Sequence, residues 1–303
     1  MPTLFCFGLG YSASHYIAEY GARFDRIAGT VRTREKAAGI AGTGIGGHKV
    51  EAFVFHGAAA PEVVSAAPEV VAAVTDANAI LISAPPQPDG DAVLRHFADT
   101  IAAAPHLQGM VYLSTVGVYG DHGGAWVDEA TPAAPLSPRS RERLAAEQAW
   151  AALGGRAGRP VAQLRLSGIY GPGQNALIQV ARGSAKRIDK PGQVFNRIHV
   201  ADIGQAIDAA FAHRANGAFN VTDDEPTPQG TPVAFAAGLL GVTPPAEIPF
   251  AEAAQGMTPM GLWFYGESKR VRNAKLKSEL GVALRYPTYR EGLRALLVDP
   301  GGI

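Results

Sequence analysis

The sequence predicts an α/β fold built on a doubly wound parallel sheet, with a smaller lobe formed by the C-terminal part of the chain. Short apolar runs typical of buried strands alternate with segments of helical period. The 36 glycines and 22 prolines exceed average usage and indicate many turns between these elements. Hydrophobic residues make up 47% of the 303 residues, which is enough for a sizeable core.

The first three predicted elements form a β-α-β unit. Residues 3–7 form a buried strand, residues 12–20 a helix and residues 26–31 a second strand, so the two strands should pair in parallel. The elements predicted next are strands at 49–55, 79–83 and 110–114, with helices at 60–74 and 91–104 between them. This alternation is typical of a sheet covered by helices on both faces.

A helix is predicted to begin at Ser137-Pro138, with the serine as N-cap and the proline at the first helical position, and to end at Gly154-Gly155. The elements predicted after it are a strand at 161–166, a helix from 176, a strand at 194–199, a helix at 201–213 and a strand at 219–222. We therefore expect a Rossmann-type domain over residues 1–170, to which residues 194–222 return. Residues 171–193 and 223–303 should form the smaller substrate lobe.

Charge and composition argue against several classes of protein. The 27 basic residues balance the 27 acidic ones, so no global field favours binding to nucleic acid or to an anionic membrane. The single Cys6 lies in an apolar run and is expected to be an inert buried thiol. No spacing of His, Cys, Asp or Glu suggests a metal site. No signal peptide is recognisable before Gly8, and no apolar run reaches the roughly 20 residues of a membrane helix, so we expect a cytoplasmic protein.

A glycine motif follows the first strand. Gly8-Leu9-Gly10-Tyr11-Ser12-Ala13 matches the dinucleotide-binding pattern, in which the first glycine forms a tight turn and the second lets the backbone approach a pyrophosphate. The helix N-terminus would then face the phosphates. A second match at 42–47 follows a helix and precedes a strand, which is the wrong context. The alternative is an ordinary glycine turn of another α/β protein.

The end of the second predicted strand bears on the choice of cofactor. NAD sites place an acidic residue here for the ribose hydroxyl, but this chain has Arg32-Thr33-Arg34. An arginine holds a phosphate with two donors, so NADP is the expected cofactor and NAD the less favoured one. The alternative is that Arg32 and Arg34 belong to a solvated loop.

Four segments in order resemble the extended branch of the short-chain dehydrogenase/reductase superfamily, which contains nucleotide-sugar epimerases and dehydratases. These segments are Ser114-Thr115-Val116-Gly117-Val118-Tyr119-Gly120, the acidic loop 128–135, Arg165 to Gly173, and Arg197 to Asp202. The likeness spans nearly the whole chain. It implies a small-molecule substrate and the possibility of a homodimer formed through two helices.

The resemblance also implies site residues. Further cofactor contacts are expected at Ser83, Ala84 and Pro85, at Ser114 and at Arg143. Thr115 corresponds to the residue that orients the carbonyl oxygen of the substrate, although its hydroxyl could instead bond to backbone. Substrate contacts are expected at Asn175 and at Arg197, for which a surface ion pair is the alternative; His199 is expected to be structural.

The chain departs from this branch at its proton-transfer residues. Aligning the helix predicted after the strand at 110–114 places Arg139 at the family's tyrosine and Arg143 at its lysine, and an arginine cannot deliver and recover a proton. Arg143 could contact the cofactor ribose or pair with Glu147. A Tyr-x-x-x-Lys at Tyr265 to Lys269 lies in the C-terminal lobe and is taken as a coincidence. Gly168 replaces the branch's usual asparagine, which weakens the inference of nucleotide-sugar specificity.

Two functions remain open from the sequence. The first is an NADP-dependent oxidoreductase or epimerase/dehydratase-like enzyme acting on a small carbonyl or hydroxyl compound that resembles a nucleotide sugar. In it Tyr119 would act as the acid, unless Tyr119 is an ordinary packed tyrosine. The second is a non-catalytic NADP-binding sensor or regulatory protein of the same fold, which the missing tyrosine and lysine would permit.

Overall fold

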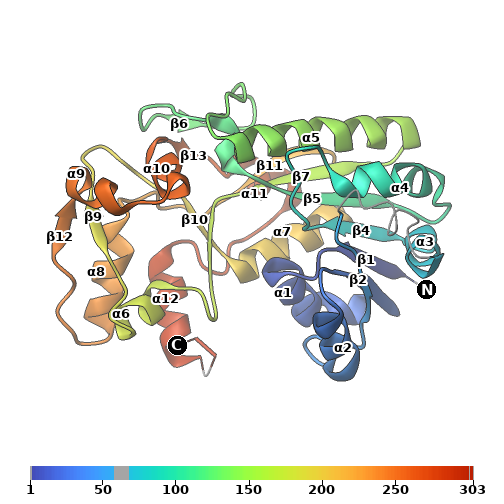
Figure 1. Cartoon of the computed structure of the whole chain (residues 1–303), viewed down its shortest axis with the longest axis horizontal. Coiled ribbons are helices and arrows are strands. Elements are labelled where there is room, and N and C mark those ends of the chain that lie inside the picture. The colour runs from blue at the N-terminus through green and yellow to red at the C-terminus, as the bar shows by residue number, and fades with distance from the viewer. Residues whose placement is uncertain (1, 58–67, 300, 303) are drawn as a thin grey trace.

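A seven-stranded parallel sheet forms the centre of the computed structural model, which describes residues 2–57, 68–299 and 301–302 (Figure 1). Its strand order is β11-β7-β5-β4-β1-β2-β3. The strands are β1 (Thr3–Phe7), β2 (Arg26–Val31), β3 (Glu51–Val54), β4 (Ala79–Ile82), β5 (Gly109–Thr115), β7 (Val161–Leu166) and β11 (Gly217–Val221). The chain runs outward from β1 in both directions, so the sheet is doubly wound, as predicted.

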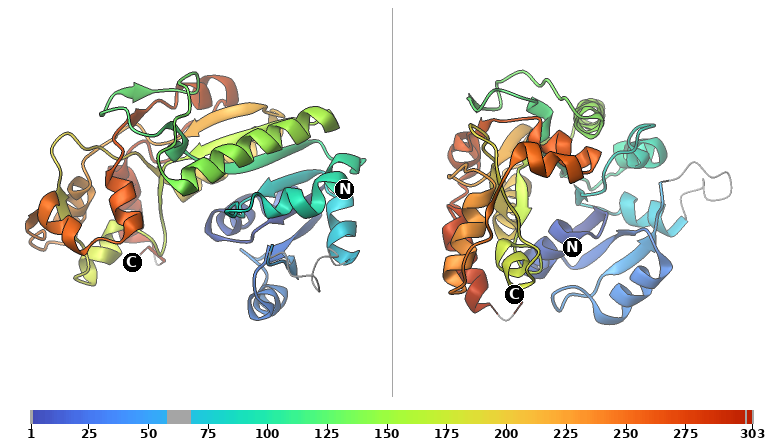
Figure 2. Two further views of the ribbon diagram at one scale, coloured as in Figure 1. Left: turned by 45° about the horizontal axis from the view of Figure 1, so that its top comes forward. Right: turned by 60° about the vertical axis from the view of Figure 1, so that its left-hand side comes forward.

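Successive side chains of each strand point to opposite faces of this sheet, and they are apolar on both faces, so helices cover both. Leu4 and Cys6 face α1 (Tyr11–Tyr20), α7 (Val200–Ala212) and α11 (Ala274–Leu280). Phe5 and Phe7 face the opposite layer. That layer consists of α3 (Pro68–Thr75), α4 (Ala92–Ala103) and α5 (Pro138–Ala157). Figure 2 shows α5, the long green helix, lying along one face of the sheet.

The other elements lie at the sheet edges or in a second group beside the sheet (Figure 1). Three two-stranded parallel pairs are β10 with β8, β12 with β9, and β13 with β6. Their bounds are β6 (Trp126–Val127), β8 (Gly168–Tyr170), β9 (Arg187–Asp189), β10 (Arg197–His199), β12 (Glu247–Pro249) and β13 (Arg270–Val271). The remaining helices are η1 (Gly21–Arg23), α2 (Arg34–Thr43), η2 (Val116–Tyr119), α6 (Ala176–Ala181), α8 (Gly230–Leu239), α9 (Phe250–Ala253), η3 (Ala254–Gly256), α10 (Pro259–Tyr265) and α12 (Tyr289–Val298).

Two local predictions were wrong. Helix α5 does not end at Gly154-Gly155 but continues to Ala157 and ends at Gly158, which has a φ of +63°. A side chain at Gly154 would lie 2.4 Å from Val161 Cγ2, so Gly154 serves the close approach of helix and strand rather than the helix end. The strand expected at 194–199 is confined to 197–199 and pairs with β8 outside the central sheet. Of the helix expected at 60–74, residues 60–67 lie outside the described residues.

Candidate functional site

The turn between β1 and α1 is shaped by its two glycines. Gly8 has a φ of +92°, and a side chain there would lie 2.9 Å from the backbone nitrogen of Ala84. Its N–H donates to Thr30 Oγ1 at 3.0 Å, and the N–H of Leu9 donates to the Thr30 carbonyl at 2.8 Å. The turn is therefore fixed to β2 and passes close to the end of β4.

The N-terminus of α1 is open. Gly10 is the N-cap and supplies no side-chain acceptor, and a Cβ at this position would meet no atom within 4 Å. The first amides of a helix lack partners within the helix and attract an anion. Ser12 and Ala13 are buried at this end of the helix, whereas Tyr11 donates its hydroxyl to the Pro172 carbonyl at 2.9 Å.

A cavity of about 470 Å³ opens at the carboxyl ends of β1, β2 and β4. Eight of the thirteen residues expected to contact the cofactor line it. They are Gly8, Leu9, Gly10, Arg32, Thr33, Ser83, Ala84 and Pro85. Carboxyl ends of parallel strands where the strand order reverses are the usual position for a dinucleotide. The cavity therefore fits the adenosine side of such a cofactor.

Two cations and no acidic side chain are found among the described residues that line this cavity. Arg32 follows β2, and Lys36 lies in the first turn of α2, where Thr33 caps the helix by accepting from the Lys36 N–H at 3.2 Å. Within the described part of the chain, neither Arg32 nor Lys36 forms an ion pair. Lys36 was missed from the sequence, although its place three residues after a threonine N-cap could have indicated it.

A second cavity, of about 580 Å³, lies at the carboxyl ends of β5 and β7. Thr115 and Arg143 line it. Thr115 Oγ1 accepts from the Gly117 N–H at 3.1 Å, so its own proton stays available to a ligand. Arg143 donates to the Leu113 carbonyl at 2.6 Å and to the Tyr112 hydroxyl at 3.3 Å. The ion pair considered between Arg143 and Glu147 does not form.

Ser114 is placed differently from Thr115. Strand residues alternate between faces, so Ser114 points to the opposite side of β5. It is buried and outside the three cavities described in this subsection. Its Oγ has no hydrogen-bond partner among the described residues. A cofactor contact by this side chain therefore has no support from its position.

Tyr119 lies in the packed interior rather than in a cavity. It is 0% exposed, its hydroxyl donates to Asn220 Oδ1 at 2.8 Å, and it accepts from Arg165 at 2.9 Å. Arg165 in turn forms a two-bond ion pair with Glu147, at 3.1 and 2.8 Å. Burial raises the pKa of Tyr119, which opposes ionisation. The position of Tyr119 thus contradicts the expectation that it exchanges a proton with a ligand.

We expect Tyr119→Phe to lower the free energy of unfolding by about 1–3 kcal/mol, because donors of Arg165 and the oxygen of Asn220 lose a buried partner. Cofactor affinity and turnover should stay within twofold of the unchanged protein. Urea unfolding and turnover of the folded variant measure the two effects. A tenfold loss of turnover at unchanged stability would contradict the structural role.

A third cavity, of about 590 Å³, lies between α6, α8, α12 and β8, and both residues expected to bind substrate line it. Asn175 is the N-cap of α6. Its side-chain oxygen accepts from the Ile178 N–H, and its side-chain nitrogen donates to two carbonyls, so both groups already have partners within the protein. Arg197 donates to the carbonyls of Phe195 and Pro228 and to Thr227 Oγ1. These bonds hold the loops together, and the surface ion pair considered for Arg197 is not formed either.

Asp223 lies beside Arg197 in the interior, and burial raises its pKa to about 8. The folded protein therefore holds a proton on this carboxyl between about pH 4 and 8, where the unfolded chain has lost it. Stability should fall as the pH rises across this range. We expect Asp223→Asn to flatten that decline and to raise the midpoint of thermal unfolding at pH 8, as calorimetry at several pH values can test. An unchanged slope would contradict the protonated state.

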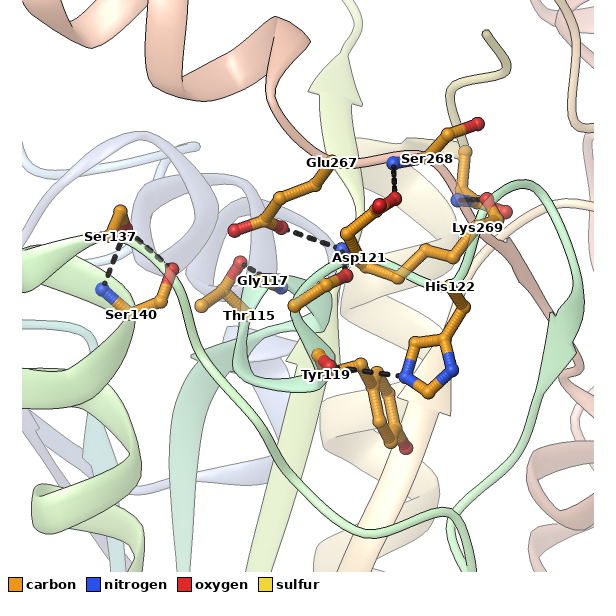
Figure 3. A network of polar contacts seen from close by, with 12 residues as sticks. Thr115, Gly117, Tyr119, Asp121, His122, Ser137, Ser140, Glu267, Ser268 and Lys269 are labelled. Carbon is orange, nitrogen blue, oxygen red and sulfur yellow. Dashed lines mark hydrogen bonds and ion pairs between the residues drawn. The ribbon is translucent and has the colours of Figure 1, made fainter. Parts of the chain in front are cut away.

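The second cavity also contains Lys269, whose Tyr-x-x-x-Lys context was taken as a coincidence, and Glu267, which the sequence did not indicate. Trp263 and Arg139 line it too. Tyr265 is buried against Phe195 instead, so the motif does not act as a unit. Figure 3 shows Glu267 and Lys269 close to the loop after η2.

Over the described ranges 2–57, 68–299 and 301–302, no group of three or more His, Cys, Asp or Glu side chains is arranged to hold a metal ion. In the same ranges, no helix has both the length and the apolar character required to cross a membrane.

Comparisons with known proteins gave a family match to part of the chain and solved structures of the same fold. The sequence model of the NAD dependent epimerase/dehydratase family matches residues 93–222. A conserved protein of unknown function from Silicibacter pomeroyi is 42% identical, with a TM-score of 0.86, over 99% of this chain and 100% of its own. MoeE5, solved in complex with UDP-glucose and NAD, is 21% identical with a TM-score of 0.75, over 97% and 96% of the two chains.

A curated relative adds a reductase to these comparisons. The 3-diazoavenalumate denitrifying reductase of a Streptomyces species is 29% identical over 140 residues. That match covers 43% of this chain and 45% of the reductase, so this chain aligns with less than half of its length.

Proposed function

We propose that the chain, as a member of the short-chain dehydrogenase/reductase superfamily in its epimerase/dehydratase branch, transfers a hydride between NADP and a small carbonyl or hydroxyl compound. The observation that carries the proposal is the presence of two cations, Arg32 and Lys36, in the cavity beside the Gly8 turn. An acidic residue would favour the ribose hydroxyls of NAD, whereas a guanidinium and an ammonium favour the 2′-phosphate of NADP.

The residues of this cavity have separable tasks toward the cofactor. The amides at the start of α1 would hold the pyrophosphate, since Gly10 leaves their approach open. Arg32 and Lys36 would hold the 2′-phosphate, and Ser83 to Pro85 would border the adenosine. When bound, the cofactor supplies or accepts a hydride. The further contact proposed for Arg143 would have to use donors beyond the one committed to the Leu113 carbonyl.

The substrate is proposed to occupy the second and third cavities together. Both are lined by Gly168, Phe195, Asn196 and Phe264, so they adjoin. Thr115 would donate a hydrogen bond to the reacting oxygen, while a longer substrate would extend toward Arg182 and Tyr289 in the third cavity. A two-part molecule such as a nucleotide sugar suits this space, and MoeE5 binds UDP-glucose within the same fold.

Turnover tests the proposal. We expect the protein to oxidise NADPH in the presence of at least one member of a panel containing simple aldehydes, aromatic ketones and keto sugars linked to nucleotides. The absorbance of NADPH at fixed protein concentration reports the reaction. NADPH binding without oxidation by any member would favour the second candidate, a non-catalytic sensor, for which Arg139 at the family's tyrosine position is the supporting observation.

A further inference from the structure

Lys269, which is buried, and Glu267, which is half-buried, form an ion pair in the wall of the second cavity (Figure 3). Lys269 is 6% exposed, and its Nζ donates to Glu267 Oε2 and to the Gly120 carbonyl, both at 2.7 Å. An ammonium has three donors. The third has no partner among the described residues, while the side chain lines the same cavity as Thr115.

The backbone around this pair is fixed to the loop after η2. The N–H of Ser268 donates to Asp121 Oδ1 at 2.7 Å, and this bond holds the pKa of the Asp121 carboxyl below its usual value. The Ser268 carbonyl accepts from the N–H groups of His122 and Gly124, at 3.0 and 2.9 Å. The segment is therefore placed relative to the end of β5, where Thr115 lies.

The same segment is fixed from its other side by Asn196. Its side chain donates to the Lys269 carbonyl and accepts from the Val271 N–H, both at 2.9 Å. Strand β13 also pairs with β6. A buried lysine costs stability unless it is paired, so this degree of support would be needed to keep the ammonium beside a cavity.

Arg139, at the position of the family's tyrosine, lines the same cavity. Its guanidinium stays protonated and cannot supply a proton. Glu267 and Lys269 are the groups lining this cavity that can release and recover one.

We propose, as an extension of the proposed function, that Lys269 is the proton donor of the reaction and that Glu267 positions it. The carbonyl carbon gains a hydride from NADPH, the C=O double bond becomes a single bond, and the oxygen takes a proton from Nζ of Lys269. The amine regains a proton from water by way of the Glu267 side chain. The sum is one carbonyl compound, one NADPH and one proton, giving one alcohol and one NADP⁺.

Rates of the Lys269 variants test this role with a carbonyl compound on which the unchanged protein acts. We expect Lys269→Met to lower the rate of NADPH oxidation at least about 100-fold, the lower range for general acid catalysis. Lys269→Arg keeps the charge but cannot release a proton, so it should be equally slow. Lys275→Met is the matched control, because Lys275 also donates to a carbonyl, that of Ala218 at 2.9 Å, but lines none of the three cavities.

The pH profile and a binding measurement separate proton donation from structure. The rate of the unchanged protein should fall at high pH, and that limb should vanish from the residual rate of Lys269→Arg. Other titratable or charged groups around Lys269 are Glu267 on its own segment, Asp121 and His122 on the loop, and Arg139 and Arg143 on α5. Calorimetry on NADP⁺-loaded protein, where no turnover occurs, should show about tenfold weaker binding of the carbonyl compound to Lys269→Met, with the affinity for NADP⁺ unchanged.

Three outcomes divide the two proposals. A large loss in both Lys269 variants, with normal melting temperature and cofactor affinity, supports the proton donor. Turnover within threefold in Lys269→Met, or full rescue by Lys269→Arg, overturns it and leaves the proposed function intact. If the unchanged protein oxidises NADPH with none of the carbonyl compounds tested, the proposed function is overturned, and this inference with it.

Discussion

Glu147→Ala should lower the free energy of unfolding by about 3–5 kcal/mol, the cost of leaving one member of a buried ion pair without its partner. Glu147 is 2% exposed, and both its carboxylate oxygens accept hydrogen bonds from Arg165, so the ion pair joins α5 to β7. Alanine would leave the Arg165 guanidinium buried with Tyr119 as its remaining side-chain partner. Unfolding in urea, followed by circular dichroism, measures the loss.

Gln148→Ala is the matched control, since Gln148 is the exposed neighbour on the same helix. It should change stability by less than about 0.5 kcal/mol, as is usual for surface positions. The double variant Glu147→Leu with Arg165→Met should recover most of the loss, because no charge remains buried. Equal effects of Glu147→Ala and Gln148→Ala would show that the ion pair contributes little.

Replacing both Arg32 and Lys36 by alanine should weaken NADPH binding about 100-fold and NADH binding less than threefold. Each cation is expected to contribute about tenfold, or 1.4 kcal/mol, through a charge-assisted bond to the 2′-phosphate that NADH lacks. Fluorescence titration of the bound nicotinamide measures both affinities.

Arg34→Ala is the control for a general effect of removing positive charge. Arg34 lies on α2, as Lys36 does, but does not line the cavity. It should change the NADPH affinity by less than threefold. Equal losses for NADPH and NADH in the double variant would place the two cations away from the 2′-phosphate and would remove the ground for preferring NADP.

Most of the fold could be predicted because local signals and long-range packing agree. The strands at 3–7, 26–31 and 161–166 were predicted with the bounds that the structure has, since each is a short apolar run between turn residues. The end of α5 could not be predicted from Gly154. A side chain at this position would clash with Val161, so the glycine allows the close packing of helix against strand and does not mark the helix end.

The residues of the proposed cofactor cavity could largely be predicted to lie together, because they follow successive strands whose ends must meet at one edge of a parallel sheet. The place of the proposed proton donor could not be predicted. Lys269 lies 154 positions after Thr115, and long-range contacts, among them those of Ser268 and Asn196, bring it to the end of β5. Tyr119 follows Thr115 by four positions, yet it turns into the interior toward Asn220.

Titration of the unchanged protein with NADPH and NADH, at one ionic strength, tests whether the cavity beside the Gly8 turn selects NADP. We expect a dissociation constant for NADPH at least about tenfold below that for NADH, because Arg32 and Lys36 would meet a phosphate in one cofactor and a hydroxyl in the other. Equal affinities, or tighter binding of NADH, would contradict it.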